Sequence, residues 1–430
     1  MFHFDDFELI LGNSQVVGEG FDYRIFLNHY GGRPLTLWTF YLNYIWSGTD
    51  PGAYHVINFF LHFLVACLLF QTAVFYRFDL DVAFLGAAIF LVHPIQTQAV
   101  NYIWSRSLLL MSVWIFISIL TYKKKSIMGL VAFQFAIWSR AEALILTPIL
   151  LAQNRRRWFP LTLIALINLV GIGWGIHQEN SPEFGLNYHR VAEYWWAQPW
   201  IFLRYMSWFF WPFGLSIDHD FNTVGSILEI LPSVIFLTAI LFFLKFNPRS
   251  VSSTGFFLGL GALMLLPSAI FPNPDILNES RTYLAVAALS LLAATLILRL
   301  TRKKIKRKAI VGSVVLIPLI LLTQLRNETW RSDVAIWEDA VKKAPGKSRT
   351  HYNLGVALAK TQQLERARES FLQASRLNPF DDLSYAGLGY CAEIQGNTDL
   401  AYSYYLKAVQ LVPENRYAQE ALARLSEPSY

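Results

Sequence analysis

The sequence contains little charge for its length. Asp, Glu, Lys and Arg make up 15% of its 430 residues, whereas a soluble domain carries about 25%. Hydrophobic residues make up 54%, and the mean hydropathy is +0.35. This composition argues against a large soluble core. It predicts a membrane protein with several spans as far as about Gln324, followed by a soluble helical domain.

Several functional classes are disfavoured by what is missing. The chain has two cysteines, Cys67 in an apolar run and Cys391 in a predicted repeat helix, so we expect neither a disulfide framework nor a cysteine metal cluster. No Gly-x-Ser-x-Gly or His-Glu-x-x-His pattern occurs, which argues against hydrolase chemistry. The net charge of +6 does not indicate nucleic acid, because the basic residues collect in short runs between apolar spans.

Basic runs and apolar spans alternate along the chain. Three Lys at 123–125, three Arg at 155–157 and the run 299–308 lie between spans, and the positive-inside rule assigns them to the cytoplasm. The segments 1–32, 94–105, 177–226, 273–282 and everything after Gln324 then share the opposite face. Spans are predicted near 53–76, 81–93, 103–122, 127–139, 141–153, 159–176, 228–246, 255–272, 283–299 and 309–325.

The first residues follow no apolar span and no signal peptide. The alternation nevertheless places them outside the cytoplasm. We therefore expect either a further segment upstream or translocation together with the hairpin that follows.

Ionisable residues beside the spans are site candidates, since a charge in hydrocarbon costs roughly 2.5–3.5 kcal/mol. Asp5 and Asp6 suit a general base or a hard cation site, with a solvated loop as the alternative. Arg106 can fork two donors onto a phosphate or snorkel to the headgroups. Arg140 and Glu142 carry isolated opposite charges that can pair with each other or with groups across a cavity.

Polar and aromatic residues mark two further stretches. The segment 177–226 is rich in tryptophan, which is typical of an interfacial belt or of a sugar-stacking surface. It also contains Asp218-His219-Asp220, a candidate acid/base or metal cluster. Near 53–76 a polar stripe follows one helix face, which predicts that it faces the bundle interior: Tyr54, His55, Asn58 and His62.

Beyond Gln324 the chain repeats with a period of 34 residues. One unit covers about 348–381 and the next about 382–415, and six positions match at this offset. The matching positions are Leu354-Gly355 with Leu388-Gly389, Ala367 with Ala401, Phe371 with Tyr405, Ala374 with Ala408, and Pro379 with Pro413. This pattern predicts tetratricopeptide repeats, with a half unit before them and a capping helix near 416–425 after them. Such repeats stack into a surface that binds peptides or proteins.

The motifs stand in a fixed order along the chain. They are Phe4-Asp5-Asp6, Arg33-Pro34-Leu35-Thr36, His93-Pro94, Arg106, Ser139-Arg140-Ala141-Glu142, Gln198-Pro199, Tyr205, Asp218-His219, Arg281-Thr282-Tyr283-Leu284 and Arg326-Asn327, ahead of the repeats. In this order the sequence resembles the transmembrane and tetratricopeptide repeat-containing (TMTC-type) proteins and their bacterial relatives. Those proteins are similar to GT-C glycosyltransferases, including protein O-mannosyltransferases. The resemblance covers nearly the whole chain.

The resemblance implies an all-α fold. A polytopic, GT-C-like transmembrane helix bundle would cover 1–325, and a tetratricopeptide-repeat α-solenoid would cover 326–430. The implied activity is transfer of a sugar from a polyprenyl-phosphate-linked donor to a protein hydroxyl or another glycan acceptor on the non-cytoplasmic face. The repeats would bind the acceptor or a partner protein.

The resemblance also implies site residues. The acidic motif of the family falls on Asp5 and Asp6, the catalytic candidates. Substrate contacts are expected at Arg33, His93, Arg106, Arg140, Glu142, Asp218, His219, Arg281 and Tyr283. No metal ligand set and no definite cofactor is implied, although a divalent cation is one alternative. This sequence departs from the family where Lys-Glu becomes Arg140-Ala141-Glu142 and where residues are inserted within the Glu-Arg-Tyr motif, at 279–283.

The expected partners are the polyprenyl-phosphate sugar lipid, the membrane, and a protein or peptide on the repeats, without nucleic acid. The expected location is a bacterial inner membrane, or the endoplasmic reticulum in a eukaryote, with the repeats on the periplasmic or lumenal side. Two alternatives stand beside the transferase. One is a non-catalytic membrane scaffold whose repeats assemble an envelope complex, and the other is a flippase for lipid-linked sugar.

Overall fold

The structure is a computed structural model. It describes residues 2–3, 6–18, 20–23, 26, 33–122, 124, 127–153, 158–179, 188–220, 253–270, 275–300 and 305–426. Most of these residues are helical, and no strand occurs among them. The chain divides into two compact units. One comprises Met1–Leu215 with Thr223–Asn327, and the other comprises Ser216–Asn222 with Glu328–Tyr430.

The first unit is built from long helices with short helical turns between them. Its early elements are η1 (Phe7–Leu11), α1 (Ser14–Val17), α3 (Pro34–Ser47), α4 (Pro51–Phe75) and α5 (Leu80–Val92). Then come η2 (Pro94–Gln96), α6 (Thr97–Asn101), η3 (Ile103–Ser105), α7 (Arg106–Tyr122), α8 (Met128–Ser139), η4 (Ala141–Leu146), α9 (Thr147–Gln153) and α10 (Trp158–Glu179). The last are α11 (Tyr188–Phe210), α13 (Ser253–Ile270), η7 (Glu279–Thr282), α14 (Tyr283–Leu300) and α15 (Ile305–Glu328).

Four segments of the described residues are long and apolar enough to cross a membrane. They are Pro51–Phe75, Ile103–Tyr122, Glu279–Leu300 and Lys308–Glu328. A further span can be formed by Leu80–Val92 with Pro94–Asn101, which are bent by 52° where Pro94 ends α5. Shorter apolar helices occupy Met128–Ser139, Ala141–Leu151, Trp158–Gly171 and Gly255–Ile270. The predicted span 228–246 lies outside the described residues. The predicted all-α membrane bundle is confirmed.

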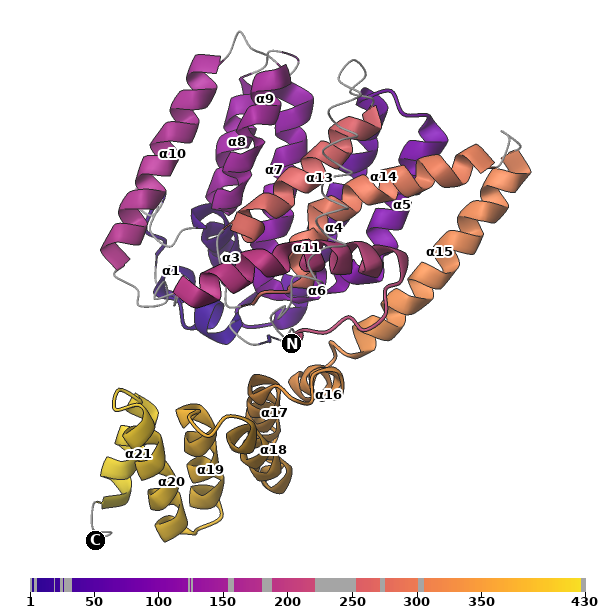
Figure 1. The fold of residues 1–430 in the computed structure, drawn as a ribbon. Helices are drawn as coiled ribbons and strands as arrows, with labels where there is room; N and C mark the ends of the chain where they lie inside the picture. The colour runs from indigo at the N-terminus through magenta and orange to yellow at the C-terminus, as the bar shows by residue number, and fades with distance from the viewer. Residues whose placement is uncertain are drawn as a thin grey trace. The chain divides into compact units, whose positions relative to one another are not determined.

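Within this unit α7 packs against α4 and α8, and α14 packs against α5 and α13. In Figure 1 α11 runs across one end of the bundle rather than along it. Its contacts agree, because the Tyr194 hydroxyl donates to the main-chain oxygen of Ser268 and Trp195 Nε1 donates to that of Ile270 at 3.0 Å. The segment 177–226 therefore contains an amphipathic helix, and its outward tryptophans, which are exposed, fit an interfacial belt. These are Trp195, Trp196, Trp200 and Trp211.

The second unit is the repeat domain. Two helix pairs follow a single helix and precede a last one: α16 (Asp333–Lys343), α17 (Ser348–Lys360), α18 (Leu364–Leu377), α19 (Asp382–Ile394), α20 (Thr398–Leu411) and α21 (Arg416–Ser426). A Cβ on Gly355 would lie 2.7 Å from the ring of Phe371, and one on Gly389 would lie 2.7 Å from the ring of Tyr405. The glycines thus let each buried aromatic ring fill the space between paired helices, as the 34-residue period predicts.

Candidate active site

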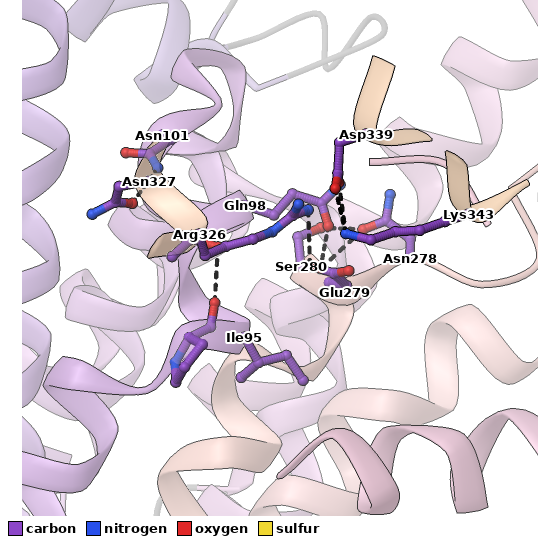
Figure 2. Close-up of polar contacts among 12 residues, drawn as sticks. Ile95, Gln98, Asn101, Asn278, Glu279, Ser280, Arg326, Asn327, Asp339 and Lys343 are labelled. Carbon is purple, nitrogen blue, oxygen red and sulfur yellow. Dashed lines mark hydrogen bonds and ion pairs between the residues drawn. The ribbon is translucent and has the colours of Figure 1, made fainter. Parts of the chain in front are cut away.

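Most of the predicted site residues lie at one end of the helix bundle. There the turn 94–105 faces η7, because the Ser280 main-chain N–H donates to Gln98 Oε1 at 3.2 Å. The C-terminal end of α15 reaches the same place, where Asn101 Nδ2 donates to Asn327 Oδ1 at 2.8 Å. Figure 2 shows these contacts together. Segments far apart in the sequence therefore converge at this end of the bundle.

Asp6 is buried at the start of the chain, next to η3. Its Oδ1 accepts the main-chain N–H of Trp104 at 2.8 Å, and its Oδ2 accepts that of His3 at 3.0 Å. A carboxylate at the beginning of the helical segment η3–α7 is also favoured by the helix dipole. Asp6 thus anchors the acidic N-terminal segment. Its predicted catalytic partner, Asp5, lies outside the described residues.

Arg106 is fully buried at the first position of α7. Its Nε donates to Asn58 Oδ1 at 3.0 Å and its Nη2 to Asn43 Oδ1 at 2.8 Å. The main-chain oxygens of Thr39 and Tyr54 accept further bonds at 3.3 and 3.2 Å. The ring of Phe40 lies 4.3 Å from the guanidinium carbon. These contacts favour a structural role, since a phosphate would have to displace them and the buried group does not reach the headgroups.

Arg33, Arg140 and Glu142 form a second cluster, which we call the arginine cluster. Arg140 donates two hydrogen bonds to Glu142, from Nε to Oε2 at 3.0 Å and from Nη2 to Oε1 at 2.5 Å. The Thr36 hydroxyl donates to the main-chain oxygen of Ser139 at 3.3 Å, which holds the start of α3 beside the end of α8. Arg33 therefore lies close enough to Arg140 and Glu142 for their charges to change its pKa. Pairing of Arg140 with Glu142 was one of the two alternatives predicted from the sequence, and the fold adds Arg33 to this pair.

The arginine cluster carries more positive than negative charge. Burial first, and then the charge of Arg140, lower the pKa of Arg33 from 12.5 to about 10, although Glu142 opposes this effect. One carboxylate shared by two guanidinium groups leaves the charge of Arg33 poorly compensated. Arg33 has one hydrogen bond recorded within the described residues, from Nη1 to Ser107 Oγ at 3.2 Å. The cluster is therefore suited to binding an anion.

Trp104 connects the arginine cluster to the acidic segment. Its main-chain N–H binds Asp6, while the guanidinium carbon of Arg33 lies 5.2 Å from the centre of its ring. The ring also stacks on Phe40, with the ring centres 5.9 Å apart and the planes 11° from parallel. Trp104 was not among the site residues predicted from the sequence. Its signal is weak, because tryptophan at the end of a span is common in membrane proteins.

His93 and Tyr283 are buried packing residues in this structure. His93 Nε2 lies 2.9 Å from the main-chain oxygen of Phe209, and its ring stacks on that of Phe209. The Tyr283 hydroxyl lies 2.7 Å from His62 Nδ1, between α4 and α14. The side-chain contacts recorded for both residues are within the bundle. Their predicted role in substrate binding stays a prediction.

Arg281 joins two tyrosines of α11. Its positive charge acts on the phenols of Tyr194 and Tyr205, and its Nη1 donates to the main-chain oxygen of Ile276 at 3.2 Å. Burial raises the pKa of both tyrosines, so they remain neutral near pH 7. The Tyr205 hydroxyl also accepts the main-chain N–H of Asn278 at 3.3 Å. The hydrogen bond between Asn278 and Tyr205 therefore joins the start of η7 to α11.

Asp218 and His219 belong to the second unit and not to the membrane bundle. Arg349 Nε and Nη2 donate to the two carboxylate oxygens of Asp218 at 2.7 and 2.6 Å, and Lys347 Nζ donates to Oδ1 at 2.6 Å. Lys347 also donates to the main-chain oxygen of His219 at 3.0 Å. Burial tends to raise the pKa of Asp218, but Arg349 and Lys347 outweigh it and lower the pKa. The structure thus does not group these residues with the arginine cluster.

One buried ion pair was not among the predicted contacts. Glu279 and Arg326 are both buried, with Oε2 and Nη2 4.0 Å apart, and Figure 2 shows them between η7 and the end of α15. The available signal was that each is an isolated charge at the edge of an apolar span.

Among the described residues no group of three or more His, Cys, Asp or Glu could hold a metal ion. The divalent cation near the acidic pair stays a prediction.

Comparison with known proteins gives a match to a family model and several relatives. A family model for the tetratricopeptide repeat matches residues 331–382 and 352–416. The protein O-mannosyl-transferase F38B6.6 of Caenorhabditis elegans is 26% identical over 427 residues, which cover 88% of this chain and 60% of that protein. The protein O-mannosyl-transferase TMTC3 of Homo sapiens is 24% identical over 511 residues, covering 99% of this chain and 54% of that protein.

A third relative is more similar over a shorter stretch. The protein O-mannosyl-transferase TMTC1 of Homo sapiens is 32% identical over 145 residues, which cover 30% of this chain and 16% of that protein. Where the similarity extends over most of this chain, the chain spans a little over half the length of the curated relatives it matches.

Proposed function

We propose that this chain, a transmembrane and tetratricopeptide repeat-containing protein of the TMTC type, is a membrane glycosyltransferase that moves a sugar from a polyprenyl-phosphate-linked donor to a protein hydroxyl. The acceptor oxygen forms a bond to the anomeric carbon, and its proton passes to a carboxylate. The bond between the anomeric carbon and the phosphate oxygen breaks, and the lipid phosphate leaves with the electron pair. The names of the relatives, all protein O-mannosyl-transferases, support this reaction class.

One observation carries the proposal: Asp6 and Arg33 both contact Trp104, although more than 70 positions separate Trp104 from either in the sequence. The reaction needs a base near the acceptor and a cation near the leaving phosphate. A carboxylate at the main chain of one residue and an under-compensated guanidinium at its ring suit that requirement. We assign the proton transfer to Asp5, the positioning of the acidic segment to Asp6, and the phosphate contact to Arg33.

Arg140 and Glu142 then position Arg33. Both carboxylate oxygens of Glu142 accept hydrogen bonds from Arg140, so this carboxylate does not neutralise Arg33 directly. Arg281 is a second candidate for the phosphate or the sugar, because tyrosine hydroxyls beside a guanidinium can hydrogen-bond sugar hydroxyls. The apolar spans would hold the prenyl chain. Localisation on the non-cytoplasmic face of a bacterial inner membrane or of the endoplasmic reticulum is part of the same proposal.

The repeat domain would bind the acceptor protein or another partner. A cavity of about 310 Å³ between α17, α18, α19 and α21 is lined by Tyr352, Phe371, Leu383, Tyr390 and Tyr417. Its size lies at the small end of ligand pockets, which measure about 300–1,000 Å³. It suits one or two apolar side chains of an extended peptide. Along the sequence we propose domain limits at 1–325 and 326–430, with 216–222 as a part of the first range that belongs to the second compact unit.

The test is a transfer assay on the full chain purified in detergent, with polyprenyl-phosphate sugars as donors and a hydroxyl-containing peptide as acceptor. We expect transfer by the wild type, loss of transfer in Asp5→Asn, and a raised KM for the donor in Arg33→Ala. Arg299→Ala is the matched control for Arg33→Ala. Arg299 is an exposed arginine in the last turn of α14, at the end of that helix away from η7. It should behave as wild type.

The main alternative is a membrane scaffold, which the repeat cavity and the repeat family model would equally support. A scaffold would show no transfer with any donor, and Asp5→Asn would leave its biological role unchanged. Deletion of 348–415 would then abolish that role. Such a pair of results would replace the transferase proposal.

A further inference from the structure

Helix α15 is attached to α5 at two points. At one end Lys308 Nζ donates to Asp81 Oδ2, near the first residues of both described segments. At the other end the Thr323 hydroxyl donates to the main-chain oxygen of Val92 at 2.7 Å. The first contact joins the starts of the two helices and the second joins their ends, so the two helices run parallel. Between these points α15 is poorly covered, since none of its most apolar window is buried.

A cavity of about 400 Å³ lies between the two attachment points, toward the end with the Lys308–Asp81 pair. Apolar atoms dominate its lining, which comes from α5, α14 and α15: Phe84, Leu85, Leu298, Ala309, Gly312 and Leu316. Gly312 contributes no side chain to this lining, and a Cβ there would meet only Leu85 Cδ1, at 3.8 Å, so a large side chain at position 312 would have room to enter the cavity. We call this cavity the α15 groove. It is a gap between spans that no side chain fills.

In a membrane such a gap is filled by hydrocarbon rather than water. An apolar groove beside a lipid-facing helix gains dispersion contacts when an acyl chain enters it. The outward residues of α15, including Val314 and Ile317, are exposed and apolar, so the groove opens toward lipid. The occupant must therefore present an alkyl chain in the groove and a headgroup at its mouth.

The charge at the mouth selects the headgroup. Lys308 ends the run Arg-Leu-Thr-Arg-Lys-Lys-Ile-Lys-Arg-Lys at 299–308, which contains seven basic residues. Asp81 is the acidic residue paired with Lys308 there. Basic groups between helices on the cytoplasmic side are suited to anionic lipid phosphates. Lys308 lies beside Asp81 at the start of α5. The arginine cluster, where we place the donor phosphate, lies near the other end of α5. That end leads from His93 through 94–105 to the start of α7, where Arg33 binds Ser107.

We propose that the α15 groove is a binding site for an anionic phospholipid, with one acyl chain against Gly312 and the phosphate at Lys308. The site holds whether or not the chain transfers sugar, because none of the residues assigned to the reaction lines it. An acyl chain there fills the gap between α15 and the bundle. The lipid would thus stabilise the attachment of the helix that leads into the repeats.

The experiment is native mass spectrometry of the delipidated full chain in detergent, titrated separately with phosphatidylglycerol and phosphatidylcholine. We expect one tightly bound phosphatidylglycerol and weaker binding of phosphatidylcholine. Lys308→Ala should weaken phosphatidylglycerol binding roughly fivefold, as expected for one lost cation near an anionic headgroup. Gly312→Phe should remove the site. Val314→Phe is the matched control, because Val314 lies two positions away with an exposed side chain, and it should bind as wild type.

Three outcomes would overturn the proposal. The first is equal binding of both lipids by the wild type, and the second is unchanged binding by Gly312→Phe. The third is displacement of phosphatidylglycerol by a polyprenyl phosphate at equal concentration, which would assign the groove to the donor lipid. If Gly312→Phe does not fold, Leu316→Trp fills the same groove and is judged by the same criteria.

Discussion

The carboxylate of Asp6 and the main-chain N–H of Trp104 form a hydrogen bond of 2.8 Å between residues 98 positions apart. The bond fixes the acidic N-terminal segment to the turn that begins α7. The Trp104 ring in turn lies beside Arg33, the member of the arginine cluster with the least compensated charge. Any displacement of Trp104 would therefore change both the acidic segment and the candidate phosphate contact.

Asp6→Asn should reduce both stability and transfer. An asparagine has one acceptor oxygen and an NH₂ group, so it cannot accept from His3 and Trp104 on both sides as Asp6 does. One buried N–H left without its acceptor costs about 1–3 kcal/mol. We expect a lower thermal midpoint in detergent and a large fall in kcat with little change in the donor KM.

Asp79→Asn is the control for this variant, because Asp79 is exposed and makes no capping hydrogen bond at the start of α5. A smaller donor affinity with unchanged kcat in Asp6→Asn would contradict the positioning role. So would a thermal midpoint equal to that of the wild type.

Arg106 and Arg33 should respond differently to replacement by lysine. Lysine cannot reach Asn43, Asn58 and the two main-chain oxygens at once, and each buried acceptor left unpaired costs about 1–3 kcal/mol. We expect Arg106→Lys to lose several degrees of thermal stability. Arg33→Lys should keep the fold, because Arg33 is only partly buried and has one recorded hydrogen bond.

The donor KM separates the two variants. We expect Arg33→Lys to raise the donor KM roughly tenfold. A lysine at position 33 loses one of the two hydrogen bonds of a bidentate phosphate contact, which is worth about 1.5 kcal/mol. If Arg106→Lys instead raises the donor KM at unchanged stability, Arg106 contacts the substrate and the structural role is wrong.

The sequence predicts the helices and the repeats of this fold, because both depend on local pattern. Apolar runs of the right length define spans such as Pro51–Phe75, and the 34-residue period places Gly355 and Phe371 at corresponding helix positions. A family model confirms the repeats. Pattern alone also predicted that Asn58 and His62 face inward, and both are buried.

The sequence does not predict which polar groups meet, because pairing between distant segments leaves no periodic signal. For Arg106 it left phosphate binding and snorkelling open, and the partners seen are two asparagines 63 and 48 positions earlier. For Asp218 it suggested the membrane site. The basic partners of Asp218 come from α17 and its N-terminal boundary, more than 120 positions later.

Enlarging Gly389 should destabilise the repeats without changing the membrane bundle. A Cβ there would lie 2.7 Å from the Tyr405 ring, closer than atoms in van der Waals contact. Overpacking of a core costs about 1–3 kcal/mol. We expect Gly389→Val to increase hydrogen exchange of α19 and α20 in the full chain.

The control for Gly389 is the double variant Gly389→Val with Tyr405→Leu, which gives the larger side chain room. It should recover part of the protection. Equal exchange in the wild type and in Gly389→Val would show that the close packing of Tyr405 is not needed.

The attachment of Asp218 to the repeats should weaken in acid. Its folded-state pKa is lowered, so its stabilisation is complete above its unfolded pKa of about 3.9 and is lost as pH falls through the lower folded-state value. Hydrogen bonds to charged groups contribute about 1.5–3 kcal/mol, and solvent screening at the exposed Arg349 places this pair toward the lower end. We expect Asp218→Asn to expose 216–220 and the start of α17 to hydrogen exchange at pH 7. Asp220→Asn, at an exposed neighbour, should leave both protected. The difference between wild type and Asp218→Asn should begin to shrink below about pH 4, and it should vanish below the folded-state pKa of Asp218, where both variants are uncharged at position 218. A difference that stays constant from pH 7 to pH 3 would mean that shape, and not charge, holds this segment to the repeats.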